Sequence, residues 1–180
     1  MPTRFRLPFG CGALQTRVMN EPGPPATQRI VKLVLDEAVG RHPSADVEHE
    51  RKVAIYDLVD GNLFSPAGAA LGPYSVLLKT VENRMVMELT DGAGAPVEPV
   101  SIPMTPFRTL MKDYGRVCAA YMEAIRAAAP SRIEAIDMGR RGLHNEGAEL
   151  LQDILKDKVE IDEETARRLF TVLYVFHMRG

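Results

Sequence analysis

The stretch that decides the fold is TPFRTLMKDYGRVCAAYMEAI, residues 105–125. Thr105 followed by Pro106 is a typical helix start, because threonine caps free N–H groups and proline suits the first helical position. Apolar side chains then recur at helical spacing: Phe107, Leu110, Met111, Tyr114, Val117, Cys118, Tyr121 and Ile125. This pattern predicts a long amphipathic helix with one face against a core.

Three strand-like runs precede this helix and predict a small antiparallel meander. PYSVLLKTV at 73–81 and RMVMELTD at 84–91 are separated by Glu82 and Asn83, a spacing that suits a tight hairpin. PVEPVSIPM at 96–104 contains three prolines, which favour an edge position.

An earlier strand and helix are predicted before the meander. RIVKLVLDE at 29–37 is rich in β-branched residues and reads as a strand. Apolar residues then recur at helical spacing over 46–61, with Ser44 and Asp46 as capable N-caps and Gly61 as the stop.

Further helices are predicted after Pro130, which cannot continue the long helix. Ser131 can cap a short helix through Ile136, and another helix is expected to begin near Asn145, with the run GRRGLHN as a loop between them.

The final segment reads as a helix capped by Asp162, with a β-strand as the alternative because of its β-branched residues. The stretch from Phe170 to Phe176 has so few polar positions that it is expected either to be buried or to pair with another subunit.

Together these elements predict an α+β fold: a small, mostly antiparallel sheet packed with about five helices. The 180-residue length fits a single domain over residues 29–180. Residues 1–28 are rich in proline and show no sustained period, so they are predicted to be a poorly ordered leader.

The composition is that of an ordinary globular protein, with 46% hydrophobic and 26% charged residues and a net charge of -2. This balance does not indicate nucleic-acid binding. Only Cys11 and Cys118 are present, which favours a reducing compartment over a disulfide framework. No stretch suggests a signal peptide or membrane span, so a cytoplasmic location is expected.

The run GRRGLHNEG at 139–147 is the strongest candidate site. If a helix begins near Asn145, its free N–H groups together with Arg140, Arg141 and His144 would bind a phosphate or carboxylate. The simpler interpretation is structural: the glycines and Asn145 are helix ends, and the arginines are solvated or pair with acidic neighbours such as Asp137 and Glu146.

The run EHER at 48–51 is a weaker candidate. His49 and Glu50 could join His144 and Glu146 in an acid/base or metal-ligand set only if the fold brings them together. No recognisable catalytic motif, metal motif or cofactor motif is present. A charged exposed helix face explains EHER equally well.

These candidates lead to three functional hypotheses. The first is a cytoplasmic binding or regulatory protein, without catalysis, that recognises an anionic small molecule or protein partner through Arg140, Arg141, His144 and Asn145. The second is an acid/base or metal-assisted enzyme that uses His49, Glu50, His144 and Glu146. The third is a homodimeric adaptor that uses the apolar C-terminal segment.

Five blocks of the chain resemble uncharacterised protein family 0262, a family of small alphaproteobacterial proteins. These blocks are DVEHERKVAIYDL, GPYSVLL, TPFRTLMKDY, EAIDMGRRGLHNEGAELL and ARRLFTVL, and their order and spacing match over most of residues 29–180. The proline-rich leader departs from the family. The resemblance implies no known activity, cofactor or catalytic residue.

Overall fold

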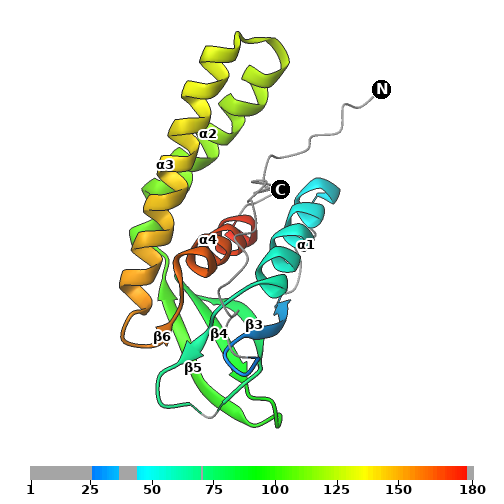
Figure 1. Ribbon diagram of the computed structural model, residues 1–180, viewed down its shortest axis with the longest axis vertical. Coiled ribbons are helices and arrows are strands. Elements are labelled where there is room, and N and C mark those ends of the chain that lie inside the picture. Colours follow the sequence, from blue (N-terminus) through cyan, green and yellow to red (C-terminus); the bar gives the residue numbers. More distant parts are fainter. Residues whose placement is uncertain (1–25, 37–43, 70, 178–180) are drawn as a thin grey trace, which may run out of the picture.

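A computed structural model describes residues 26–36, 44–69 and 71–177 of the chain. Figure 1 shows helices on one side of a twisted sheet and a helical hairpin that projects beyond both. Of the predicted leader, residues 1–25 lie outside the described residues. Gln28 belongs to the fold, because its backbone carbonyl accepts a hydrogen bond from Phe64.

The predicted meander is confirmed. Strands β3 (Tyr74–Val81), β4 (Arg84–Thr90) and β5 (Pro96–Pro103) pair antiparallel in that order. Val81 pairs with Arg84, so Glu82 and Asn83 form the two-residue turn. β5 lies at the edge of the sheet, where prolines lacking an N–H group are tolerated.

The sheet is mixed rather than purely a meander. Strand β1 (Ile30–Leu35) pairs with β3 in parallel, which gives the order β1-β3-β4-β5. The predicted helix, α1 (Ala45–Asp60), lies in the connection between these two strands, and a connection of this kind lets neighbouring strands run in the same direction.

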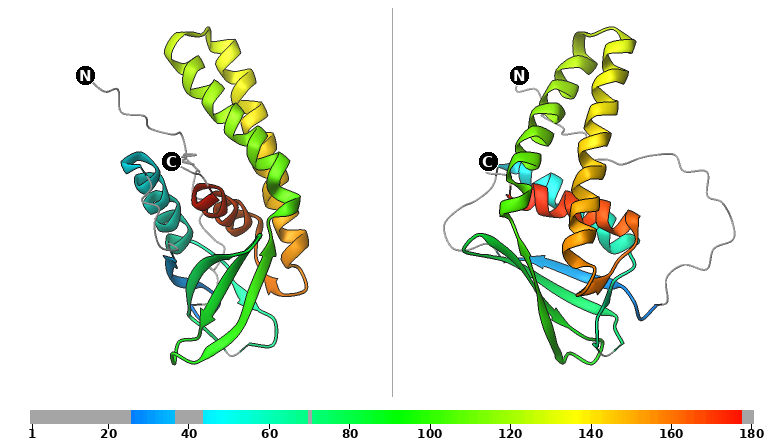
Figure 2. Two further views of the ribbon diagram at one scale, coloured as in Figure 1. Left: turned by 180° about the vertical axis from the view of Figure 1, so that it is seen from behind. Right: turned by 90° about the vertical axis from the view of Figure 1, so that its left-hand side faces the viewer.

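One face of the sheet supplies much of the core. Side chains alternate along each strand, so every second residue is buried in the first part of β3, in β4 and in the second half of β5: Tyr74, Val76, Leu78, Met85, Met87, Leu89, Val100 and Ile102. Helices α1 and α4 (Glu163–His177) lie on this side of the sheet (Figure 2).

Two of the predicted helix caps are confirmed. The Ser44 hydroxyl accepts from the backbone N–H of Val47 at 3.4 Å, and the Asp162 carboxylate accepts from the N–H of Thr165 at 2.7 Å. Thr105 is not a cap, contrary to prediction. The chain instead enters a short 3-10 helix, η1 (Thr105–Phe107), and the Thr105 hydroxyl accepts from the side-chain amide of Asn83 at 2.6 Å.

The long predicted helix is α2 (Arg108–Ala127), which Pro130 separates from the next helix. That helix, α3 (Pro130–Leu155), runs without interruption for 26 residues, so the two helices and loop predicted here are wrong. The described residues therefore contain four α-helices and one 3-10 helix rather than about five helices. A helical glycine costs only about 1 kcal/mol, which side-chain packing easily offsets.

Helices α2 and α3 form the projecting hairpin seen in both views of Figure 2. α4 packs against α3 and α1. A second, two-stranded sheet of β2 (Ser65–Pro66) and β6 (Val159–Glu160) connects the end of α3 to the segment after α1. None of the helices in the described residues has the length and apolarity that a membrane crossing requires.

The final segment is a helix, as preferred, and it is buried within the chain. Phe170, Val172, Leu173 and Val175 of α4 are all 0% exposed. The apolar side chains of this segment form part of the core, which is the first of the two predicted outcomes, while a homodimer stays an untested prediction.

Candidate functional site

The predicted anion-binding loop does not exist. Residues 139–147 lie in the interior of α3, where backbone N–H groups bond to carbonyls one turn earlier. Asn145 is not an N-cap and no helix begins near it. Any ligand must therefore be bound by the side chains of this stretch.

Gly147 has a packing role instead of marking a helix start. A Cβ atom at this position would lie 2.5 Å from the ring of Phe170, closer than any real contact. Glycine thus allows α4 to approach α3 and bury Phe170 between them. The sequence pattern contained no information about this contact.

Both arginines of the GRRG run contact Asp137 one turn earlier. Arg140 donates to one carboxylate oxygen through Nε at 3.0 Å and Nη2 at 2.7 Å, and Arg141 Nε reaches the other oxygen at 2.7 Å. Burial raises the pKa of Asp137, but the hydrogen bonds and charges of the two arginines outweigh it and the pKa is lowered. The predicted pairing of the arginines with Asp137 is confirmed, while the predicted helix ends at the glycines and Asn145 are wrong.

The Arg140 side chain also faces α2. Its guanidinium lies 5.3 Å from the ring centre of Tyr121, a cation–π contact, and it hydrogen-bonds the Tyr114 hydroxyl. Arg141 points outward, with 68% of its side chain exposed. The two adjacent arginines thus share one carboxylate but differ in their access to solvent.

His144 is 8% exposed and lies where α2, α3 and α4 meet. Its Nε2 is 2.9 Å from the Thr171 hydroxyl, which itself donates to the carbonyl of Arg167 at 3.1 Å. Because that hydroxyl has one proton, His144 must donate through Nε2, which leaves Nδ1 as an acceptor.

The environment of His144 keeps it neutral. Burial, followed by the positive charges of Arg167 and Arg140, lowers its pKa to about 4. Arg167 is partly buried, and its guanidinium has no hydrogen-bond or ion-pair partner among the described residues. Two cations from different helices therefore lie near one uncharged imidazole.

We call Arg140 and His144 of α3 together with Arg167 and Thr171 of α4 the α3 cluster, and aromatic rings surround it. Tyr114 is central, with ring-centre distances of 5.6 Å to His144, 5.8 Å to Phe170 and 4.9 Å to Tyr174. Burial raises the pKa of Cys118 to about 11 and that of Tyr174 to about 12. Cys118 is thus a buried neutral thiol and not an activated nucleophile.

The residues of the enzyme hypothesis are divided between two helices, α1 and α3, and differ in burial. His49 is exposed on α1, while Glu50 is buried on the same helix. His144 is buried on α3, and Glu146 is exposed. Within the described ranges, no three His, Cys, Asp or Glu side chains are grouped so as to hold a metal ion.

The neighbouring Arg51 explains part of the EHER run. It is buried, and it donates to the carbonyls of Val175 and Phe176 at 3.3 Å each, at the end of α4. A cation at this position satisfies free carbonyls and matches the negative end of the helix dipole. The role of Arg51 is therefore to anchor α4 to α1.

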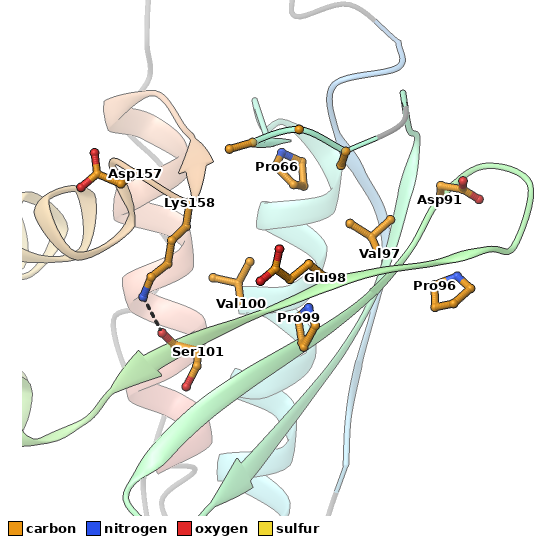
Figure 3. A pocket seen from close by; sticks show the side chains of 13 residues that line it. Pro66, Asp91, Pro96, Val97, Glu98, Pro99, Val100, Ser101, Asp157 and Lys158 are labelled. Atoms are coloured by element: carbon orange, nitrogen blue, oxygen red, sulfur yellow. Dashed lines mark hydrogen bonds between the residues drawn. The ribbon is translucent and has the colours of Figure 1, made fainter.

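A pocket of about 510 Å³ lies elsewhere, between β5, the turn after β2 and the start of β6 (Figure 3). Lys158 at one end donates to the backbone carbonyl of Ser101 at 3.2 Å. None of the predicted site residues lines this pocket.

Sequence reasoning missed two members of the α3 cluster, Arg167 and Thr171, and the adjacent Tyr114. Tyr114 was assigned to the apolar stripe of α2, and it is indeed buried. Arg167 and Thr171 lie one turn apart on α4. No local pattern indicates that they face His144.

The fold and the cluster define a class: an α+β protein with a projecting helical hairpin and a buried histidine beside two arginines. The model of the uncharacterised protein family UPF0262 matches residues 27–179. The chain therefore belongs to this family, as its resemblance in five blocks implied.

Its relatives come from alphaproteobacteria. A UPF0262 protein of Chelativorans sp. is 52% identical over 155 residues, which are 86% of this chain and 96% of the relative. One from Rhizobium etli is 51% identical over 152 residues, 84% and 96% of the two chains. One from Rhodopseudomonas palustris is 49% identical over 164 residues, 90% and 100%. No solved structure matches the chain.

Proposed function

We infer that this protein is a binding protein without catalytic activity, and that it recognises a phosphate or carboxylate group where α3 meets α4. The binding residues of this proposal are Arg140, Arg141 and Arg167, with His144 between the two helices. The ligand is an anionic small molecule or an acidic group of a protein partner.

Arg167 is the observation that carries the proposal. A partly buried guanidinium is stabilised when it pairs with an anion, and Arg167 has no such partner among the described residues. On α3, Asp137 offsets only one of the two arginine charges. The cluster therefore has an excess of positive charge that an anion would neutralise.

The neighbouring polar groups favour binding over acid/base catalysis. A histidine with a pKa of about 4 is a poor base at neutral pH, where an effective catalytic base has a pKa near 7. Asn145 remains in the proposed site, because its Oδ1 is buried without a hydrogen-bond partner in the described part of the chain. It would accept a hydrogen bond from a protonated ligand oxygen.

The reducing cytoplasm remains the proposed location. Cys118 is a free, buried thiol, which is consistent with that compartment.

The test is an NMR titration of His144 with and without sodium sulfate, which stays a dianion over the pH range used. A sulfate bound near Arg167 and Arg140 offsets the charges that depress the histidine, so we expect the pKa of His144 to rise from about 4. Sodium chloride at equal ionic strength controls for general screening.

Arg167→Gln should abolish this response to sulfate, since it removes the cation without a partner. Arg132→Gln is the matched control: Arg132 is an exposed arginine about 12 Å from Arg140 along the same helix. An unchanged His144 pKa in saturating sulfate, or an equal response in both variants, would contradict the proposal.

A further inference from the structure

Two glycines of α3, Gly139 and Gly142, have no packing role. Both are exposed, and a Cβ atom added to either would meet nothing within 4 Å. Gly115 and Gly147 differ, because their added Cβ atoms would lie 2.9 Å from the Tyr174 hydroxyl and 2.5 Å from the Phe170 ring. The first pair therefore weakens the helix without allowing any close contact within the described part of the chain.

The contacts of Asp137 span this weak point. Its carboxylate binds Arg140 and Arg141, three and four residues later, so the bonds cross the turn that contains Gly139. Asp137 and Arg140 are shielded from solvent, with side chains 18% and 19% exposed. We call this set, Asp137 with Arg140 and Arg141, the clip.

The clip lies at a boundary in the structure. On its C-terminal side, α3 packs on α4 through His144 and Gly147. From the clip to the N-terminal end of α3, α2 is the only described element that lies beside α3, as both views of Figure 2 show. A change in helix order at 139–142 would therefore affect residues 130–138 and leave the packed half in place.

We propose that residues 137–142 form a hinge that the clip holds closed and that an anion opens. The hinge rests on the proposed function, because the incoming anion competes with Asp137 for Arg140 and Arg141. When Asp137 is displaced, Gly139 no longer has side-chain bonds across it, Gly142 lies directly after the released arginines, and residues 130–138 lose helical order. Anion binding at the base is thereby coupled to the shape of the hairpin tip.

The test is amide hydrogen exchange of the full chain, measured by mass spectrometry with and without sodium sulfate. In the wild type, we expect exchange in residues 130–138 to become about fivefold faster in sulfate, while residues 144–155 are unchanged. Asp137→Asn should show the fast exchange without sulfate, since an amide holds the guanidinium groups less strongly.

The double variant Gly139→Ala with Gly142→Ala should lose the exchange response and keep the sulfate-induced shift of the His144 pKa. The control Ala135→Gly adds a glycine on the same exposed side, outside the clip. It should raise basal exchange and still respond to sulfate.

The outcomes separate the hinge from the binding site. If sulfate shifts the His144 pKa but leaves exchange in residues 130–138 unchanged, the hinge is wrong and the binding site stands. If sulfate does not shift the His144 pKa, the proposed function fails. In that case, if residues 130–138 of Asp137→Asn exchange at the wild-type rate, the proposal that the clip keeps this part of α3 ordered is also wrong.

Discussion

The two halves of α3 use similar residues in different ways. In the half that packs on α4, Gly147 admits the Phe170 ring and His144 is buried and hydrogen-bonded. In the projecting half, Gly139 faces open space and Arg141 is largely exposed. The comparison shows that a glycine or a charged group in a helix has no fixed role, because neighbours from other elements decide it.

The largest expected effect is the pH dependence contributed by His144 in the packed half. Its pKa is about 4 when folded and about 6.5 when unfolded, so between these values the unfolded chain binds more protons. The stabilisation is therefore complete above pH 6.5 and is lost as the pH falls to about 4, by about 3 kcal/mol in total.

Urea unfolding at several pH values measures this dependence. The variant His144→Gln keeps a donor for Thr171 and does not titrate, so its stability should fall less steeply over the same window. If the free energy of unfolding depends on pH equally in the wild type and the variant, His144 is not held neutral in the folded protein.

The next largest effect is expected for Gly147→Ala. The new methyl group would overlap the Phe170 ring, and overpacking of this kind costs about 2 kcal/mol. Urea unfolding of the single variant and of the double variant with Phe170→Leu should show that the smaller, aliphatic side chain of leucine recovers part of the loss. A neutral Gly147→Ala would contradict the close approach of the two helices.

In the projecting half, Asp137→Asn should lower stability by about 1 kcal/mol at neutral pH, because it weakens charged hydrogen bonds that are only partly screened by solvent. Asp153→Asn is the control, since Asp153 is an exposed aspartate on the same helix. An equal loss of stability in the two variants would show that the ion pairs of the clip do not stabilise the protein.

The smallest effect has the opposite sign. Gly139→Ala should stabilise the protein by about 0.5–1 kcal/mol, because alanine favours the helix and meets no neighbour. Thermal unfolding would show this as a small rise in Tm. A loss of stability would mean that the two halves of α3 are not as different as the structure indicates.

Much of the fold was predictable because its signals are local. The periodicity of 105–125, the two-residue turn at Glu82 and Asn83, and the caps Ser44 and Asp162 each depend on neighbours in the chain. The parallel pairing of β1 was not predictable in this way, since a strand pattern gives no partner or direction.

The continuity of α3 was also not predictable from local signals. Glycine at 139, 142 and 147 resembles a break between helices, whereas ion pairs and the packing of Phe170 maintain the helix through this stretch. Within the candidate site, the pattern drew attention to Arg140, Arg141 and His144 and assigned them to a loop.

The sequence by itself thus determined where most helices and strands form, because hydrophobic period and capping act over a few residues. It also determined which residues of α3 are chemically unusual. Only the tertiary structure decided what surrounds them: it placed Arg167 and Thr171 of α4 beside His144 and paired both arginines with Asp137. Burial and charge at a site depend on side chains distant in sequence, and those distances are set when the helices pack.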